Sequence, residues 1–352
     1  MVTDRNVAYL GCIDPHHIPG DLDEIVAAGC NSITMTVDEC DWTYYRRARR
    51  IIVREARARG LRLYIGLHGF GIFSSPIPSN QYPLEHPESG QVFNTGRHAV
   101  TACPNDAGFT AWLKGTVAEI IQEFKPDGMF WDEPAFYWSD KWPQEWACRC
   151  GNCQSGFAKR YGRPMPTDLT PEVRQFRHES LLRFLGEVIQ SAKENGGGES
   201  ILCLMPWDRT GAASISEGWY GVIGWEPFVH MPQLDVFSTD PYWINWQSFD
   251  YFETNAREAI QLARQCGKKS QIWVQAVQIP PGKEAEVKRT LLAAADMGAD
   301  MLAVWSFRGE RGSHVLDCGG DEELVWRMVS EAYSLLQPAE GREGREGKER
   351  RV

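Results

Sequence analysis

Short apolar runs alternate along this chain with longer segments in which apolar residues recur at helical spacing. The short runs are almost continuously apolar, as the strands of a parallel sheet are when both of its faces are covered. They predict eight strands, at 7–13, 32–37, 61–67, 126–134, 200–205, 235–238, 271–276 and 301–306. Helices are predicted at 19–28, 44–59, 107–124, 171–194, 249–266, 283–297 and 321–336. This alternation is typical of the α/β class and, with eight strand–helix units, of a (β/α)8 TIM barrel.

An open, doubly wound sheet is the other fold built from such units, but no glycine-rich phosphate-binding sequence follows the first predicted strand. The 352 residues suit one barrel of about 250 residues with insertions. We expect this barrel to occupy residues 1–337, with long loops at 69–106 and 135–147 after the third and fourth strands. Residues 338–352 are rich in Gly, Glu, Arg and Lys, and we expect them to form a disordered tail.

The composition is that of an ordinary globular protein, with 43% hydrophobic and 24% charged residues. A formal charge of −10 argues against nucleic acid and anionic membranes as partners. The N-terminal residues lack the basic start and apolar run of a signal peptide, and no segment approaches the roughly 20 apolar residues that span a bilayer. We therefore expect a cytoplasmic protein without membrane contact, and we leave association into a homo-oligomer open.

The fourth predicted strand leads from an apolar run directly into two adjacent carboxylates, Asp132 and Glu133, followed by Pro134. Two acids at the end of a buried strand are costly unless they meet solvent, a partner or a substrate. An acidic loop with a helix-capping residue is the alternative interpretation. Because function in a barrel gathers at the carboxyl ends of the strands, we favour the floor of an active site.

The other strand ends carry carboxylates, amides, large aromatic residues and one imidazole. They offer no His-rich metal site, no context for a Ser or Cys nucleophile and no phosphate loop, which leaves the two-carboxylate chemistry of glycoside cleavage. Fourteen Trp residues agree with this, because sugars present apolar C–H faces that stack on aromatic rings. These strand-end residues are Asp14, Asp38, Glu39, His68, Asp132, Glu133, Trp207, Asp208, Asp240, Gln275, Trp305 and Arg308.

Three cysteines lie within six residues, at Cys148, Cys150 and Cys153. A tetrahedral zinc site built from cysteines needs a fourth ligand, and Cys103 is the best candidate. Reactive surface thiols or a redox pair are the alternatives. Four cysteine ligands would leave no open coordination position, so we expect the zinc ion to be structural, and we expect no organic cofactor.

Two parts of the chain resemble the family 42 β-galactosidases of the glycoside hydrolases. The first comprises Thr101-Ala102-Cys103-Pro104-Asn105, Trp131-Asp132-Glu133, Cys148-Arg149-Cys150-Gly151-Asn152-Cys153 and Phe157. The second comprises Gln275, Pro280-Pro281-Gly282, Gly298-Ala299-Asp300 and Trp305-Ser306-Phe307-Arg308. The cysteine spacing is the more specific part of this resemblance, and the matches at the barrel strands are weaker.

The resemblance implies a (β/α)8 barrel, zinc held by four cysteines, and an acid/base Glu in an Asn-Glu pair after the fourth strand. Glu133 occupies that place, with Asp132 where the family has Asn. The family's nucleophile is a Glu at the end of the seventh strand, where this chain has Gln275. Because an amide cannot form a glycosyl intermediate, the usual β-galactosidase route is not expected.

Three hypotheses address this departure. In the first, Asp132 is the nucleophile and Asp240 the acid/base, as in retaining barrel glycosidases of the α-galactosidase and α-fucosidase kinds, which Phe130-Trp131-Asp132 resembles. In the second, Glu133 is the general acid and Asp240, or an acid on the second strand, is the base for water, which gives inversion. In the third, the barrel binds sugar without cleaving it. Asp240 has its own alternative, as a turn-capping residue before proline.

We therefore predict a glycoside hydrolase acting on a small oligosaccharide or glycoside, with a catalytically silent sugar-binding barrel as the alternative. Because side chains alternate across a strand, Asp132 and Glu133 face the same pocket only if the strand end bulges. Barrel cores also hold Trp, and His68 has an inert core position as its alternative. The candidate sugar-binding residues are His68, Trp131, Trp207, Tyr242, Trp243, Trp273, Gln275, Trp305 and Arg308.

Overall fold

Eight parallel strands form a closed barrel in a computed structural model that describes residues 2–10, 14–74, 80–206, 218–310 and 319–337. The strand order around the barrel is β1-β10-β9-β8-β7-β6-β3-β2. Their bounds are β1 Asp4–Tyr9, β2 Ser32–Val37, β3 Arg62–Leu67, β6 Gly128–Trp131, β7 Glu199–Cys203, β8 Val236–Thr239, β9 Lys269–Gln275 and β10 Met301–Trp305. The predicted (β/α)8 barrel is confirmed.

The first and last strands close the barrel. In register, Asn6 of β1 lies opposite Ala303 of β10 on one side and Ser32 of β2 on the other. The Tyr333 hydroxyl, on the last helix, donates to the carbonyl oxygens of Asn6 at 2.7 Å and Leu302 at 3.4 Å, across this seam. Strand residues alternate between the barrel interior and the layer of helices outside. Phe130, Trp273 and Trp305 belong to the interior cluster, and Trp131 to the outer one.

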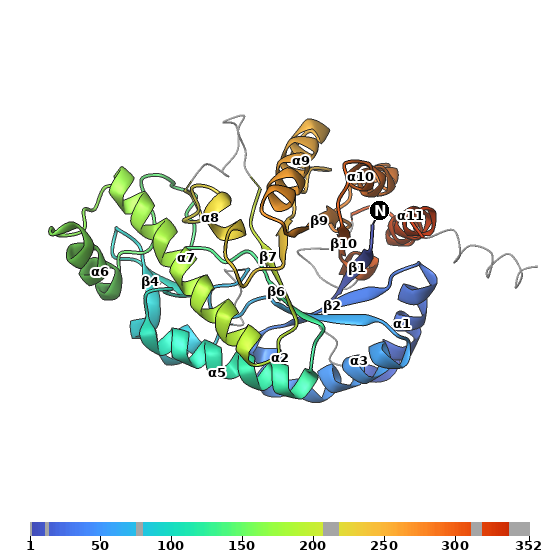
Figure 1. The fold of residues 1–352 in the computed structure, drawn as a ribbon, viewed down its shortest axis with the longest axis horizontal. Coiled ribbons are helices and arrows are strands. Elements are labelled where there is room, and N and C mark those ends of the chain that lie inside the picture. The colour runs from blue at the N-terminus through green and yellow to red at the C-terminus, as the bar shows by residue number, and fades with distance from the viewer. Residues whose placement is uncertain (1, 11–13, 75–79, 207–217, 311–318, 338–352) are drawn as a thin grey trace, which may run out of the picture.

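Helices surround the barrel, with α1, α3, α5 and α7 along one side of the view and α9, α10 and α11 along the other (Figure 1). The bounds of the longer helices are α1 Ile18–Ala27, α3 Arg46–Ala58, α5 Ala107–Phe124, α6 Gly151–Tyr161, α7 Pro171–Glu194, α9 Phe249–Gln265, α10 Ala285–Asp296 and α11 Glu322–Leu335. Shorter pieces are α2 Glu39–Tyr44, α4 Tyr82–Glu85, α8 Glu226–Val229 and the 3-10 turns at Pro15–His17, Pro87–Ser89 and Phe307–Glu310. None of the helices in these ranges is long and apolar enough to cross a bilayer.

The predicted helix at 44–59 is wrong in its first part. The chain forms α2 and α3 instead, which meet at Tyr45, where φ is −113° and ψ is 18°. The Asp38 side chain accepts from the backbone N–H of Asp41 at 2.6 Å, and Asp41 accepts in return from Asp38 N. This capping box starts a helix several residues earlier than the apolar periodicity indicated, and it gives Asp38 a structural role.

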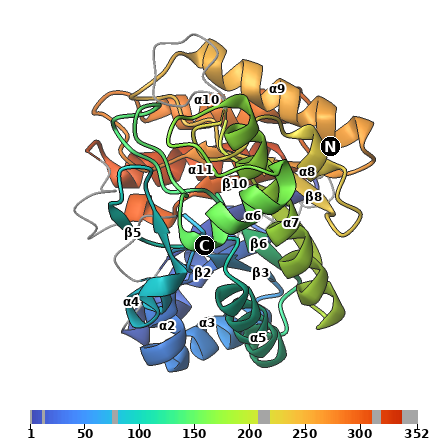
Figure 2. The same cartoon turned by 90° about the vertical axis from the view of Figure 1, so that its left-hand side faces the viewer.

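The two long loops contain structure that the sequence pattern did not predict. The first holds α4 and an antiparallel hairpin of β4 Gly90–Val92 and β5 His98–Ala102 (Figure 2). The second leads from Asp132 into α6, which lies beside the start of α7 (Figure 1), where Phe157 contacts Phe176 with ring centroids 5.7 Å apart. Both loops follow strands at their carboxyl ends and cover that end of the barrel. The predicted tail at 338–352 lies outside the described residues.

Candidate active site

Three carboxyl groups meet at the carboxyl end of the barrel. Asp132 and Glu133 follow β6, and Asp240 follows β8. Because β7 lies between these strands, its last residue, Cys203, sits among the three, with its Sγ 3.8 Å from Asp240 Oδ1. The charges of Asp240, Asp132 and Glu133 each raise the pKa of the Cys203 thiol, after burial as the largest cause.

The backbone at Glu133 explains how two neighbouring residues reach one site. Phe130 faces the barrel interior and Trp131 the helix layer, so Asp132 returns to the interior side. Glu133 has φ of 40°, in the left-handed region that a non-glycine residue rarely adopts. This breaks the alternation, and the Glu133 carboxyl makes a side-chain hydrogen bond with Asp240. Strain of this kind persists where the surrounding structure imposes it, most often at functional sites.

Glu133 and Asp240 form a carboxyl–carboxylate pair. The Glu133 carboxyl donates to the Asp240 carboxylate, and burial together with the negative charge of Asp240 raises the pKa of Glu133 well above its ordinary range. Burial also raises the pKa of Asp240 to about 7, although the hydrogen bond from Glu133 acts in the opposite direction. Two like charges in contact cannot both ionise freely, so the pair retains a proton at a pH where isolated carboxyl groups have lost theirs.

Asp132 is the third member of this carboxyl cluster. Its side chain is buried, and burial followed by the charge of Glu133 raises its pKa well above the ordinary value. The Ser74 hydroxyl and the Ser74 backbone N–H both donate to the Asp132 backbone carbonyl, at 3.4 Å and 3.0 Å, and the nearby Ser74 side chain acts to lower the pKa of Asp132. Ser74 belongs to the long loop after β3, so this loop helps to fix the backbone at Asp132. The sequence analysis missed Ser74.

The opposite end of the barrel also carries buried charge, but there it is paired. The carboxylate of Asp4 lies 3.2 Å from Arg62, and Arg62 lies 2.6 Å from Glu199, which also pairs with Lys269 at 2.5 Å. Among the described residues, no cation contributes to the pKa values of Asp132 and Glu133. Buried charges that are paired serve structure, whereas unpaired carboxyls with raised pKa values are typical of functional sites.

Aromatic side chains surround the carboxyl cluster. Tyr242, predicted as a sugar contact, lies close enough for the charges of Asp240, Asp132 and Glu133 to raise its pKa further, after burial. The pKa of Tyr220 is likewise raised by burial and by the charges of Glu133 and Asp240. The sequence analysis missed Tyr220, whose only sequence signal was an aromatic pair, Trp219-Tyr220, in the loop after β7. A Cβ at Gly221 would lie 2.3 Å from the Phe136 ring, so only glycine lets the chain pass here.

Two predicted aromatic residues line the barrel interior below this site. Trp305 packs against Trp273 with ring centroids 5.7 Å apart, and Trp273 packs on Phe130 at 5.0 Å. The indole N–H of Trp273 has no acceptor among the described residues. His68 lies beside Trp305 at 5.1 Å, and burial lowers its pKa to about 4, so it is neutral at physiological pH.

Trp131 and Trp243 lie away from this interior. Trp131 is fully buried in the outer cluster and donates from Nε1 to Ser200 Oγ at 2.8 Å. Trp243 donates to Thr290 of α10 at 3.0 Å and packs on Phe249 of α9. Both rings are buried and both indole N–H groups have acceptors within the protein, so the contact of these two rings with sugar stays a prediction. Trp207 and Asp208 lie outside the described residues.

Gln275 and Arg308 also have structural partners. The Gln275 amide donates to Asn245 Oδ1 at 2.8 Å and to Val277 O at 3.0 Å, and it accepts from Ile244 N at 3.0 Å. It thus ties the end of β9 to the loop after β8. The guanidinium of Arg308 pairs with Glu24 of α1 at 2.8 Å and with Glu323 of α11, so it binds the outer helices rather than the barrel interior.

The acids at the first two strand ends have local roles. Glu39, an alternative base in the sequence analysis, accepts backbone N–H groups of Gly71 at 3.0 Å, Gln81 at 2.8 Å and Tyr82 at 2.7 Å. Burial raises its pKa to about 7 against the effect of these bonds. Glu39 therefore anchors the long loop after β3. Asp14 is exposed and caps the 3-10 turn that follows it, accepting from His16 N at 3.1 Å.

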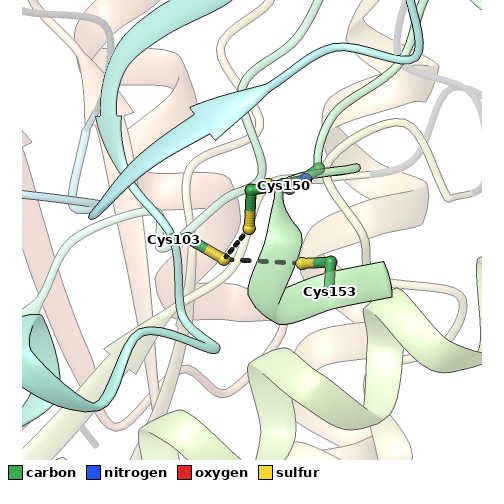
Figure 3. A group of neighbouring side chains, drawn as sticks. Cys103, Cys150 and Cys153 are labelled. Atoms are coloured by element: carbon green, nitrogen blue, oxygen red, sulfur yellow. Dashed lines mark hydrogen bonds between the residues drawn. The ribbon is translucent and has the colours of Figure 1, made fainter. Parts of the chain in front are cut away.

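The four cysteines predicted to bind metal come together. All four are buried, and their sulfur atoms lie within 4.8 Å of one another, with Cys103 3.5 Å from both Cys150 and Cys153 (Figure 3). Metal–sulfur bonds of about 2.3 Å in a tetrahedron place sulfur atoms about 3.8 Å apart. Backbone N–H groups of Val92, Asn105 and Cys150 point at the sulfurs at 3.4 Å. The donor set fits a structural metal ion that joins the two long loops.

Arg177 of α7 connects the cysteine cluster with the aromatic loop. Its buried guanidinium donates to Ala147 O at 2.6 Å, beside Cys148, and to Trp219 O at 2.9 Å. Burial lowers its pKa to about 9, while the charges of Cys148 and Cys153 act in the opposite direction. A cation held between the two segments fixes their separation, and it compensates the negative charge that four thiolates and a divalent metal would leave.

No family model and no curated protein matches the chain. Solved structures do match in fold. An endo-1,4-β-mannanase from Rhizomucor miehei aligns with a TM-score of 0.62 at 8% identity, over 94% of this chain and 95% of that one. A family 1 β-glucosidase from Thermotoga maritima aligns with a TM-score of 0.52 at 9% identity, over 90% and 87%. At such identities the likeness concerns the barrel fold, and the resemblance to family 42 stays a prediction.

Proposed function

We propose that this chain is a glycoside hydrolase that cleaves the O-glycosyl bond of a small oligosaccharide or glycoside at the carboxyl end of the barrel. The observation that carries the proposal is that Glu133 and Asp240 form a hydrogen-bonded pair beside Asp132. No cation is among the causes that raise the pKa of Glu133 or Asp132. Glycoside cleavage needs a carboxyl group that still holds a proton near neutral pH and a second one that meets the positive charge of the sugar.

Glu133 is the general acid in this proposal. The negative charge of Asp240 raises the pKa of Glu133, so its proton is available for the leaving-group oxygen. Asp240 keeps this proton on the pair until the leaving-group oxygen takes it. After the leaving group departs, the same pair accepts a proton from the attacking water.

We assign the nucleophile's role to Asp132, the third carboxyl of the cluster, which attacks the anomeric carbon in its ionised form although burial raises its pKa. The inverting alternative needs a sugar and a water between Glu133 and Asp240, with carboxyls about 6.5–9.5 Å apart. Direct hydrogen bonding between these two side chains argues against that separation. The proposed route therefore retains the anomeric configuration, and it combines the first hypothesis with the family position of Glu133.

The surroundings support a sugar ligand. Tyr242 lies beside the carboxyls and Trp305 lies in the barrel interior below them, and the indole N–H of Trp273, which has no acceptor among the described residues, offers a donor for a hydroxyl. The mannanase and the β-glucosidase that share the fold act on carbohydrates by their names, which favours this substrate class for the present chain.

We further propose that the four-cysteine cluster holds zinc, because four thiolates in a tetrahedron are a preferred structural zinc site. The ion would join the loop after β3 to the loop after β6, and Arg177 would carry that constraint to Trp219. Zinc bound by four protein ligands supplies no catalysis. Unpaired cysteines, as in the described part of the chain, support a cytoplasmic location.

A sugar-binding barrel without turnover is the second candidate, and Gln275 favours it. The seventh barrel strand, where the family 42 enzymes have their nucleophile, ends here in an amide that is fully engaged in a loop. If Asp132 does not replace that nucleophile, binding would remain and cleavage would not.

The test is release of nitrophenol from a panel of α- and β-linked aryl glycosides by wild type, Asp132→Asn, Glu133→Gln and Asp240→Asn. We expect one sugar to be cleaved, with losses of about 10²–10⁴-fold in the first two variants. Retention of configuration in the product would support Asp132 as nucleophile. Sugar binding by calorimetry without turnover on aryl glycosides and oligosaccharides would favour the silent barrel.

A further inference from the structure

The loops after β6 and β8 carry the exposed tryptophans of the described residues, Trp138 at 38% exposure and Trp246 at 54%. These loops follow the strands that supply the three carboxyls. An exposed indole is costly in water, and a sugar can cover it with the apolar C–H face of a pyranose ring. Of the two, Trp138 is connected by ring contacts to the carboxyl cluster.

A row of aromatic rings leads from the surface at Trp138 to the carboxyls. Trp138 lies 5.2 Å from Trp219, and Trp219 lies 4.6 Å from Tyr220, centroid to centroid. Tyr220 is near enough to Glu133 and Asp240 for both charges to act on it. Trp219 and Tyr220 are buried, with 6% exposure each, which leaves Trp138 as the ring with an open face.

The loop that carries Trp138 is fixed before any ligand binds. Ser139 donates from Oγ to Glu145 at 2.6 Å, and Glu145 is paired with Arg97 at 2.6 Å. The indole N–H of Trp219 donates to the Ser139 carbonyl at 3.4 Å. A preorganised aromatic face loses little conformational freedom on binding, which is what a binding subsite requires. Exposed Asp140, two residues along, offers an acceptor for hydroxyl groups.

We propose that Trp138 forms a distal sugar-binding subsite, so that the substrate is a glycan chain extending at least one further sugar unit beyond those at the cleavage point. This inference rests on the proposed function, because it takes the carboxyl cluster as the cleavage point. The two ring-to-ring steps between Trp138 and Tyr220 place the indole face more than one aromatic ring away from the carboxyls. A sugar bound on Trp138 is therefore not the one that is cleaved.

The test measures binding, so that it does not depend on turnover. In the Glu133→Gln background, calorimetry gives the affinity for gluco-, manno- and galacto-oligosaccharides of two to six β-1,4-linked units. Trp138→Ala is compared with Trp138→Phe, which keeps an aromatic face, and with Tyr44→Ala, which removes another exposed aromatic ring, at the end of α2.

We expect affinity to rise with chain length for one of these series. Trp138→Ala should lower the affinity for the longest chain by about tenfold, equivalent to about 1.4 kcal/mol, and leave the disaccharide unaffected. Trp138→Phe should retain most of the gain, and Tyr44→Ala all of it. Equal losses for short and long chains, no loss, or no binding of any chain would overturn the inference.

The outcomes for the two proposals are separable. Length-dependent binding that requires Trp138, with no cleavage by wild type, keeps the subsite and removes the hydrolase. Cleavage of short glycosides with affinity independent of Trp138 keeps the hydrolase and removes the subsite.

Discussion

Glu133 owes its position beside Asp240 to one backbone angle, the φ of 40° that interrupts the strand alternation after Asp132. A regular strand would have turned Glu133 toward the helices, as it turns Trp131. The sequence predicted that both carboxyls could matter, but it could not predict which of them faced the pocket. A positive φ at a non-glycine residue has no sequence signature, because tertiary contacts impose it.

Asp240 makes the stability of the protein depend on pH. The pKa of Asp240 is about 7 in the folded chain and about 3.9 in the unfolded chain. Between about pH 4 and pH 7 the folded state therefore holds a proton that the unfolded state has lost. This contribution to stability is fully present below about pH 4 and is lost as the pH rises through 7. Asp240→Asn removes it, and we expect the variant to be more stable than wild type at pH 8 by about 1–3 kcal/mol.

Urea unfolding at pH 5 and pH 8 measures this difference. The wild type should lose more free energy of unfolding between the two values than Asp240→Asn does. An identical pH dependence in the two proteins would show that Asp240 is not the group with the raised pKa.

We expect that replacing Gln275 by glutamate destabilises the protein and does not increase its activity. Gln275→Glu would restore the residue that the family 42 resemblance implies, but its two donated bonds, to Asn245 Oδ1 and Val277 O, would become contacts between oxygens. We expect a loss of about 2–4 kcal/mol in the free energy of unfolding and no gain in turnover. Exposed Gln265→Glu at the end of α9 is the matched control, within about 0.5 kcal/mol of wild type. A stable and faster Gln275→Glu enzyme would contradict the structural role.

At the scale of the elements, the sequence predicted best where helix signals are local. The helices at Ala107–Phe124 and Pro171–Glu194 have the predicted bounds, because Asp106 and Thr170 cap their first turns from side chains next to the apolar pattern. The helix at Gly151–Tyr161 was missed, since its apolar residues are few and its start lies within the cysteine cluster. Its position depends on the sulfur atoms rather than on hydrophobic periodicity.

The loops after β3 and β6 depend on the cysteine cluster for their relative position. We expect about one zinc per chain by elemental analysis after metal-sparing purification, and almost none in Cys150→Ser. That variant should also lose at least about 3 kcal/mol in the free energy of unfolding, because metal binding contributes directly to folding. The matched control is Cys266→Ser, at the end of α9 and outside the cluster, which should keep its metal. Equal zinc content in the two variants, or none in wild type, would contradict the assignment.

At the scale of the whole molecule, the barrel brings together residues separated by more than 100 positions. The predicted eight-strand order places Asp240 two strands from Asp132 and Glu133, and this much followed from the sequence. Whether an aromatic residue faced the barrel interior or the helices did not follow, since one step along a strand reverses it. Trp131 lies in the outer cluster for that reason, and Tyr220 was missed because no strand pattern placed its loop.

The two ends of the barrel differ in how their charged residues are paired. Asp4, Arg62, Glu199 and Lys269 form paired charges at the amino end, where barrels carry residues for stability. At the other end, none of the described residues that shift the pKa of Asp132 or Glu133 is a cation. Burial and neighbouring negative charge therefore favour a protonated carboxyl at this site, and the central claim is that Glu133 and Asp240 share its proton for catalysis.

The most direct test of that claim is the pH dependence of kcat/KM for glycoside hydrolysis in wild type and in Asp240→Asn. The charge of Asp240 raises the pKa of Glu133, so activity in wild type should persist above pH 7 and decline only when the shared proton is lost. In Asp240→Asn the negative partner is gone, and we expect the alkaline decline to move to lower pH by about one unit or more. An alkaline limb at the same pH in both enzymes would contradict the shared proton.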